Sequence, residues 1–306
     1  MPRPSVTPPS DPVPDGTAAV AGVTISHPDR LIFPDCGIRK LDLARYHEAM
    51  AEPILAELAD RPIAFLRHPE GVTGEGFFQR HAAKGWPAQI RSFAAQDGDR
   101  ALYLTEAAGL VAAVQMGVVE FHIESVHRDR PDRPDRLVFD LDPDTTVPFA
   151  EVIAAATALR DLLAEFGMPT GVMTTGGKGL HVVARLTRRS PTDNVAAFAR
   201  RVAVMMVEHQ PERFVAALSK AKRHGRILID WQRNQRAATA VAPWTVRARP
   251  GAPVAVPLDW DDLRHLSSAA AFGLDAARDR GQSPPRRPEP VTLSLVSTAL
   301  ERFLSR

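Results

Sequence analysis

Two aspartates stand two residues apart in LVFDLDPD, residues 137 to 144. The apolar run before them predicts a strand, in which Asp140 and Asp142 point to the same face. Near an apolar core, two ionised carboxylates this close repel, and one takes up a proton unless a cation compensates both. The pair therefore suggests a divalent metal site, although a lone D-x-D that ends at Pro143 is more often exposed to water.

A third carboxylate, Asp230 in RILIDWQRN, again follows an aliphatic run at the end of an expected strand. Three carboxylates on strands are the hard oxygen ligands that a two-metal phosphoryl-transfer site requires. We therefore expect them to hold two Mg²⁺ or Mn²⁺ ions. One ion would lower the pKa of an attacking hydroxyl, and the other would neutralise a triphosphate and the leaving pyrophosphate.

The segment TTGGKGLHVV, residues 174 to 183, is suited to binding phosphate. Its glycines permit a tight turn whose backbone N–H groups can converge on an anion, Lys178 adds a positive charge, and His181 begins the returning strand. The spacing is not that of a P-loop. Taken alone, the segment is better explained as a plain β-turn.

Several basic residues follow in the second half of the chain. Arg233 lies about one turn beyond Asp230, and Arg247 lies in WTVRARPG, where an extended backbone would direct it to the same face as Arg249. Arginine can bind phosphate oxygens with paired hydrogen bonds. The run KAKRHGR, residues 220 to 226, is suited to a nucleic-acid backbone. Each of these residues alone could also be an ordinary surface residue.

Aromatic residues in the first half could contact bases. Phe77 and Phe78 in GFFQRHAAKG are followed by basic residues, a combination suited to stacking on an unpaired base. The alternative is that at least one of the two lies in the core. His122 in VVEFHIE lies on an expected strand, where a single histidine is usually structural.

The elements that position these residues follow from the hydrophobic periodicity. We expect helices at 39–58, within 107–117, at 149–167, at 192–209 and near 211–221, and a last helix after a polar linker at 277–289. Strands are expected around 62–69, 77–81, 118–124, 137–142, 171–174, 180–186 and 226–231. From 137 onward, the order strand, helix, hairpin, helix, strand predicts an α/β sandwich with a mixed sheet.

Composition narrows the class of protein. The 306 residues can bury a sizeable core, and 38 Lys+Arg against 36 Asp+Glu require any polyanion site to be a local patch. A single cysteine, Cys36, rules out an internal disulfide and a cysteine-based zinc cluster. No apolar run reaches the roughly 20 residues that span a bilayer, and the Pro-rich N-terminus lacks a signal-peptide core, so we expect a cytoplasmic protein.

The ordered motifs HPDRLIFP, GFFQRHAAKG, VVEFH, PDRLVFDLDPD, TTGGKGLHVV, LIDWQRN and ATAVAPWTVRARPG resemble the polymerase domain of bacterial DNA ligase D, in the archaeo-eukaryotic primase superfamily. The resemblance covers roughly residues 23 to 265. It implies an α+β, archaeo-eukaryotic primase-like fold of two αβ modules with mixed sheets, the second RNA-recognition-like. The expected domains are a disordered leader (1–22), an N-terminal module (23–135), a catalytic metal-binding module (136–276), and a linker with a C-terminal helix (277–306).

The resemblance also assigns roles to single residues. It implies that the three aspartates bind metal, with Mn²⁺ favoured, and that His122 is a catalytic residue. It places nucleotide binding at Thr175, Lys178, His181, Arg233 and Arg247. It places DNA binding at His27, Arg30 and Lys40 for a 5′-phosphate, at Phe77 and Phe78 for the template, and at Arg223 for the DNA end. The chain departs from the family at His27, which is commonly Asn, and at Ile123-Glu124, which is often Pro-Trp.

The implied activity is template-dependent nucleotidyl transfer from NTPs or dNTPs to a primer 3′-OH at DNA ends and short gaps in non-homologous end joining. Expected partners are DNA ends and gapped duplexes with a 5′-phosphate, nucleoside triphosphates, Ku and a separate DNA ligase, in the bacterial nucleoid. With no ligase or phosphoesterase domain in the sequence, we expect either a stand-alone polymerase or an isolated domain.

Three alternatives are retained at this point. The first is a stand-alone primase-polymerase that fills gaps in excision repair. The second is a haloacid-dehalogenase-type phosphatase, because DPDTT spells D-x-D-x-T; its later acidic pair would come from LDWDDL, and Asp230 would have no role. The third is a nucleic-acid-binding module without activity, whose aspartates face water.

Overall fold

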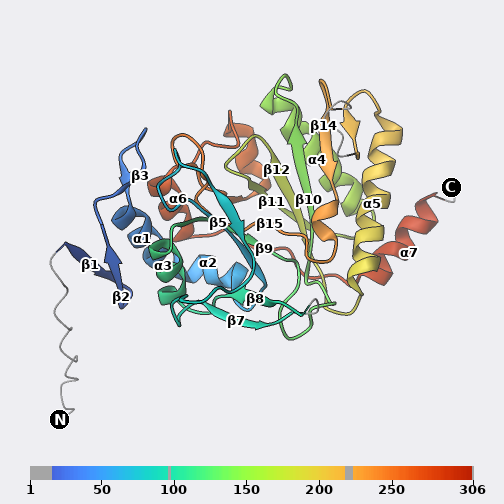
Figure 1. Ribbon diagram of the computed structural model, residues 1–306. Helices are drawn as coiled ribbons and strands as arrows, with labels where there is room; N and C mark the ends of the chain where they lie inside the picture. Colours follow the sequence, from blue (N-terminus) through green and yellow to red (C-terminus); the bar gives the residue numbers. More distant parts are fainter. Residues whose placement is uncertain (1–15, 96–97, 218–222, 305–306) are drawn as a thin grey trace, which may run out of the picture.

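The computed structural model describes residues 16–95, 98–217 and 223–304. Two large sheets form two modules that meet along their length (Figure 1). The helices are α1 (Lys40–Ala49), α2 (Ala51–Leu58), α3 (Ala107–Gln115), α4 (Phe149–Glu165), α5 (Thr192–His209), α6 (Leu274–Gly281) and α7 (Leu293–Leu304), with short 3-10 helices η2 (Gln232–Asn234) and η3 (Trp260–His265).

The first module is built on the sheet of order β15-β9-β5-β8-β7, with β6 paired to β5. Its strands are β5 (Ile63–Arg67), β6 (Phe77–Gln79), β7 (Arg91–Ala94), β8 (Arg100–Tyr103), β9 (Val118–Ile123) and β15 (Ala240–Val241). Two small hairpins precede it, formed by β1 (Thr17–Val20) with β2 (Val23–Ser26) and by β3 (Leu31–Phe33) with β4 (Ile38–Arg39).

The second module is built on the sheet of order β13-β14-β10-β12-β11-β16. Its strands are β10 (Arg136–Pro143), β11 (Thr170–Thr174), β12 (Leu180–Arg185), β13 (Phe214–Val215), β14 (Ile227–Asp230) and β16 (Pro257–Leu258). The chain order β10-α4-β11-β12-α5-β14, with antiparallel pairs and β10 and β12 in the centre, is that of an RNA-recognition-like βαββαβ unit. The order strand, helix, hairpin, helix, strand, predicted along the chain from residue 137 onward, is confirmed by β10, α4, β11, β12, α5 and β14.

Helices α4 and α5 cover one face of this second sheet. On β10 the side chains of Leu137, Phe139 and Leu141 are fully buried in the core to which both helices contribute. Because side chains alternate along a strand, Arg136, Val138, Asp140 and Asp142 point to the opposite face. That opposite face, which no helix of the βαββαβ unit covers, carries Asp140 and Asp142 and meets the first module.

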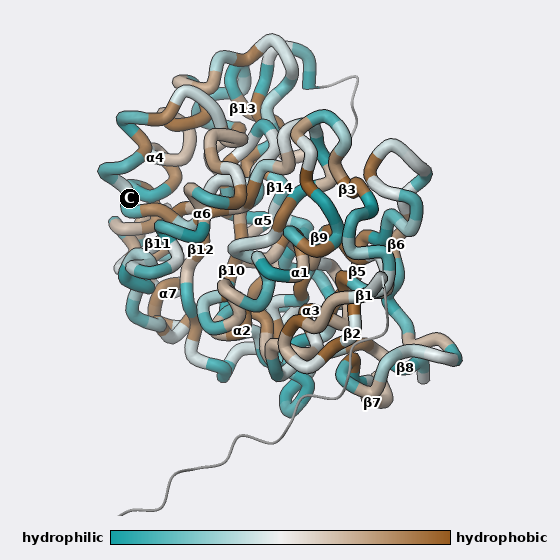
Figure 2. The backbone as a smooth tube through the Cα atoms, turned by 90° about the vertical axis from the view of Figure 1, so that its left-hand side faces the viewer, coloured by the Kyte–Doolittle hydropathy of each residue, from teal (hydrophilic) through white to brown (hydrophobic). Residues whose placement is uncertain are grey.

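Helix α4 shows how the sequence sets this packing. Its buried residues Val152, Ala155, Ala156, Leu159 and Leu163 recur every three or four positions and form one apolar stripe. Gly167 follows the helix with φ of 76°, a conformation that favours glycine. Most buried apolar residues of both modules form one core, with a small separate cluster of Met173, Val241 and Ala255. The backbone trace shows hydrophobic stretches inside and hydrophilic loops at the periphery (Figure 2).

Four expectations about the elements are corrected by the structure. The helix predicted at 39–58 is two helices that join at Met50, and the helix predicted near 211–221 is replaced by β13, with 218–222 outside the described residues. Helix α6 extends into the predicted linker at 277–289. Of the predicted leader, residues 1–15 lie outside the described residues, whereas Thr17–Val20 form β1 in a hairpin that a Pro-rich composition did not suggest.

The predicted domain boundary at residue 136 separates the two modules except at one strand, because a strand from the second half of the chain belongs to the sheet of the first module. Strand β15, from the second half of the chain, pairs with β9 of the first module at Ala240↔Ile123 and Val241↔His122. A two-residue strand carries too little periodicity to be recognised. Its pairing fixes the later loop, with Trp244 and Arg247, against the first module.

Candidate active site

Asp140 and Asp230 lie opposite each other on neighbouring strands. The antiparallel register of β10 and β14 pairs Asp140 with Asp230 and Asp142 with Leu228. Directly paired residues project to the same side of a sheet, and Asp142 follows Asp140 by two positions. The three carboxylates therefore share one face. The side chains of Asp140 and Asp230 are 16% and 7% exposed, so the alternative in which they simply face water is wrong for both.

Basic side chains surround these carboxylates. The Nε atom of Arg233 lies 3.3 Å from Oδ2 of Asp140 and 3.1 Å from Oδ2 of Asp230. His181, which pairs with Asp140 across β10 and β12, has its Nε2 atom 3.5 Å from Oδ1 of Asp140. The predicted nucleotide-binding residues Arg233 and His181 are thus both in contact with the predicted metal ligands.

The two facing carboxylates have opposite pKa shifts. Burial alone would raise the pKa of Asp140, but His181 and Arg233 outweigh it and hold the pKa at about 2. The pKa of Asp230 is raised, first by burial and further by the charge of Asp140, although Arg233 opposes this. One guanidinium shared between two carboxylates leaves negative charge uncompensated. This arrangement favours an additional cation.

The donor set suits a divalent metal in type and placement, but the carboxylates are not gathered around one point. Within the described residues, no group of three or more His, Cys, Asp or Glu side chains is arranged to hold a metal ion. The physical reason is that arginines lie between the carboxylates. Arg223 donates from Nη1 to Oδ2 of Asp142 over 2.7 Å, and Arg233 bridges the other two. Metal binding by all three aspartates therefore requires these guanidinium groups to move.

Arg223 was expected to support a DNA end from an exposed basic loop. In the structure its guanidinium instead contacts Asp142, and its side chain is only 19% exposed. Lys220 and Lys222 of the same basic run lie outside the described residues. Arg223 is thus placed to compete with a metal for Asp142.

The glycine turn between β11 and β12 is packed directly against β10. A Cβ atom on Gly179 would lie 2.0 Å from the backbone oxygen of Leu141, so only glycine allows this approach. Inside the turn, the hydroxyl of Thr175 donates to the carbonyl of Gly179 over 2.9 Å and accepts from the N–H of Gly177 over 3.3 Å. Lys178 is exposed at the tip. The turn is thereby held next to the carboxylates.

Arg247 joins this turn to the first module. Its Nη1 atom donates to the carbonyl oxygen of Thr175, and its Nε atom lies 3.0 Å from Oε2 of Glu120 on β9. Nε2 of His122 lies 2.8 Å from the same Glu120 oxygen, and the N–H of Ala248 donates to the other oxygen over 2.8 Å. The predicted residues Arg247 and His122 are therefore held by one buried carboxylate.

Glu120 was missed by the sequence reasoning. Burial would raise its pKa, but His122 and Arg247 lower it to about 2 and keep the carboxylate ionised. A signal was present in VVEFH: an acidic residue inside an apolar strand, two positions before a histidine, must share the face of that histidine. Its partner Arg247, 127 positions further along, could be found only in the folded chain.

Phe77 and Phe78 are not core residues. They are 44% and 55% exposed on β6, so the alternative that one of them is buried is wrong. The guanidinium of Arg67 lies 5.2 Å from the ring centre of Phe77. The ring of Phe78 meets His122 edge-on at 5.1 Å between centres. An exposed aromatic surface thus adjoins His122.

The three residues predicted to bind a 5′-phosphate lie together near β3 and β4. The N–H of Arg30 donates to the carbonyl of His27 over 3.0 Å, and the N–H of Lys40 donates to the carbonyl of Arg30 over 2.8 Å. Burial and the nearby charge of Arg30 lower the pKa of Lys40 to about 8. Two cations that repel each other favour a bound anion. His27 has φ of 52°, in the left-handed region that His, Asn and Asp adopt more often than most other residues.

Comparison with known proteins identifies the family. The model of the LigD primase-polymerase domain matches residues 39–285. The multifunctional non-homologous end joining protein LigD of Pseudomonas aeruginosa is 38% identical over 296 residues, which are 94% of this chain and 35% of that protein. The corresponding protein of Mycobacterium tuberculosis is 31% identical over 259 residues, 81% of this chain and 34% of that protein. The chain belongs to the LigD primase-polymerase family.

A solved structure agrees with this assignment. The polymerase domain of Mycobacterium tuberculosis Ligase D in complex with DNA matches with a TM-score of 0.76 and 29% identity, over 86% of this chain and 99% of that chain. The primase-like α+β fold expected from the sequence is confirmed, and so is the enzyme class, a DNA-directed nucleotidyltransferase of the polymerase type. The phosphatase alternative is wrong.

This LigD-family chain spans about a third of the length of the curated relatives from Pseudomonas and Mycobacterium. Among the residues that the structure describes, no helix is long and apolar enough to cross a membrane.

Proposed function

We propose that this LigD-family polymerase extends a primer 3′-OH on a DNA template at ends and short gaps during non-homologous end joining. The primer oxygen forms a bond to the α-phosphorus of an incoming NTP or dNTP, the bond to pyrophosphate breaks, and the hydroxyl proton is released. The observation that carries the proposal is the register of β10 and β14, which brings Asp140 and Asp230 face to face with Arg233 between them.

Asp140, Asp142 and Asp230 would hold two divalent ions, with Mn²⁺ favoured over Mg²⁺. When bound, such ions neutralise phosphate charge and lower the pKa of the primer hydroxyl. The facing positions of Asp140 and Asp230, which share a single guanidinium, support this assignment. For Asp142 to bind such an ion, Arg223 would have to release its carboxylate.

The protein's own groups bind and orient the nucleotide. Arg247 and the Thr175 turn are already joined, and Lys178 is exposed beside them, so the turn presents cations to the triphosphate. When the nucleotide binds, Arg233 and His181 exchange their contacts with the carboxylates for contacts with phosphate oxygens. Glu120 orients Arg247 and His122 from the first module.

The DNA contacts fall on the first module. Phe77 and Phe78 stack on template bases beside His122, because exposed aromatic rings next to cations bind unpaired bases without sequence preference. His27, Arg30 and Lys40 bind the 5′-phosphate across a gap. The solved relative was found in complex with DNA, which supports a DNA substrate for this chain.

Primer extension on a gapped duplex with Mn²⁺ tests the metal assignment. Asp142→Ala should abolish extension, and the exposed Asp261→Ala, whose partner is Arg264 at the surface, should extend as wild type. Equal extension by wild type and Asp142→Ala would show that the metal assignment is wrong.

The end-joining role is tested separately from the chemistry. Synthesis across a break should increase when Ku is added to two DNA ends with short complementary overhangs. Gap filling without any stimulation by Ku would instead favour the stand-alone role in excision repair. Ligation in the same reaction requires a separate DNA ligase.

A further inference from the structure

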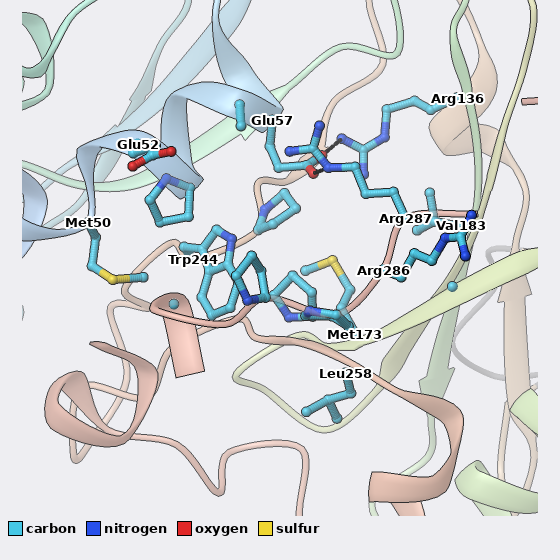
Figure 3. Close-up of a pocket in the computed structure, with 18 of the residues that line it drawn as sticks. Met50, Glu52, Glu57, Arg136, Met173, Val183, Trp244, Leu258, Arg286 and Arg287 are labelled. Carbon is cyan, nitrogen blue, oxygen red and sulfur yellow. Dashed lines mark ion pairs between the residues drawn. The ribbon is translucent and has the colours of Figure 1, made fainter. Parts of the chain in front are cut away.

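A cavity of about 670 Å³ lies between the modules, away from the carboxylates (Figure 3). It is bounded by α1 and α2 on one side, by β11 and β12 on the other, and by the segment 281–288, and it is partly open to the surface (Figure 3). None of the predicted site residues is among its described lining residues. Its volume is within the range of small-molecule sites.

The cavity and the candidate active site occupy opposite ends of the same sheet face. On β10, Arg136 shares its face with Val138 and Asp140 because the residues are two apart. On β12, Val183 shares its face with His181, and Val183 and Arg136 line the cavity while His181 contacts Asp140. Met173 also lines the cavity and is paired with His181 across β11 and β12. Met173 and His181 therefore link the two sites through a direct strand pairing.

Apolar side chains form much of the cavity wall. Trp244 and Met50 face it from one side, and Met173 and Leu258 from the other (Figure 3). Prolines complete the wall, at positions 243, 257, 284, 285 and 288. Such a wall accommodates an apolar ring or chain.

Arg136 has buried hydrogen-bond donors that lack an acceptor. Its side chain is only 8% exposed, and its Nε and Nη1 atoms are buried without a hydrogen-bond partner. The nearest carboxylate oxygen, Oε2 of Glu57, lies 3.7 Å from Nη1, too far for a hydrogen bond. A buried guanidinium without acceptors is unfavourable, so these donors favour an oxygen-bearing ligand.

The charge balance around Arg136 is positive. Glu57 is shared with Arg287, whose Nε atom lies 2.9 Å from the other carboxylate oxygen, Oε1. One carboxylate therefore compensates two guanidinium groups. Asp135 nearby is already engaged by Arg61 through two hydrogen bonds of 2.7 Å. The guanidinium of Arg136 is therefore only partly compensated by its nearest carboxylate.

We propose that this inter-module cavity binds a small organic anion: an apolar ring or chain that carries one carboxylate, sulfonate or phosphate group. The anionic group accepts hydrogen bonds from Arg136, and the apolar body packs against Trp244 and Met173. Because Met173 adjoins His181, an occupant restrains the strands that carry the candidate active site.

Fluorescence titration with the dye anilinonaphthalene sulfonate tests the site, since the dye combines aromatic rings with one sulfonate. Wild type should bind it saturably. Arg136→Met removes the donors at similar volume and should weaken binding about tenfold or more. If that variant does not fold, Arg136→Met with Glu57→Gln removes both charges together.

Gly171→Leu is an independent variant that fills the cavity. A Cβ atom at Gly171 would make ordinary contact with Pro288 at 3.5 Å, so the strand accepts a side chain that points inward. It should also weaken dye binding about tenfold or more. Leu295→Asp on α7, where Leu295 is 73% exposed, should leave binding unchanged. Wild-type affinity in both cavity variants, or no saturable binding by wild type, would overturn the proposal.

Discussion

Gly179→Ala should displace the glycine turn from β10. The added Cβ would lie 2.0 Å from the carbonyl oxygen of Leu141, against a normal C···O contact of about 3.3 Å, a shortfall of roughly 1.3 Å. The obstructing atom belongs to the backbone of a central strand and cannot rotate away. We therefore expect a loss of about 3 kcal/mol in the free energy of unfolding, at the upper end of overpacking costs.

We also expect the rate of nucleotide addition to fall, even under conditions in which the variant stays folded. Relief of the contact requires the turn to move by about 1 Å relative to Asp140 and Asp142, and a displacement of that size costs on the order of 100-fold in rate. The assay is single-nucleotide gap filling with Mn²⁺ at a temperature where the variant remains folded. Urea unfolding on the same preparation measures the stability change.

Gly177→Ala is the matched control in the same turn. Its Cβ would lie 3.3 Å from Oγ1 of Thr175 and 3.5 Å from the guanidinium of Arg249, both side-chain atoms that can adjust. We expect a change within about 0.5 kcal/mol and nearly full activity. If Gly179→Ala is as stable and as active as Gly177→Ala, the reasoning from the close approach to Leu141 is refuted.

Two further predictions concern charge. Arg223→Met should shift the Mn²⁺ midpoint for primer extension to lower concentration by several-fold, because it removes a cation that donates to Asp142; an unchanged midpoint would show that Arg223 does not compete with the metal. Burial lowers the pKa of His47 to about 4, so the folded state binds fewer protons than the unfolded state below the ordinary value of about 6.5. The free energy of unfolding is therefore at its full value above pH of about 6.5 and should decrease by roughly 3 kcal/mol towards pH of about 4. His47→Leu should flatten that part of a urea-derived stability profile, and an unchanged slope would contradict the assignment.

Long elements were predictable because their periodicity repeats many times. Helices α4 and α5 each present several turns of apolar spacing, and β10 and β14 are short aliphatic runs that end in aspartate. The break at Met50 was missed because apolar spacing continues through it. Strands β13, β15 and β16 have two residues each, so tertiary pairing alone defines them.

Residue types indicated which side chains could do chemistry, but not what they contact. Arg223 was read as part of a basic DNA-binding loop, and the fold places it on Asp142. Glu120 was passed over, and the fold places it between His122 and Arg247. Such contacts depend on residues far apart in the chain, for which local spacing carries no information.

By itself, the sequence determined that two strands end in carboxylates, that a glycine turn follows, and that one face of β10 is acidic, because side-chain alternation is a local property of the backbone. Only the tertiary structure decided that Asp140 faces Asp230, that Arg233 bridges them, and that a cavity lined by Arg136 lies on the same face. The physical reason is that sheet register and the meeting of the two modules are set by packing of the whole core, and a shift by one residue would have turned the carboxylates to the other side.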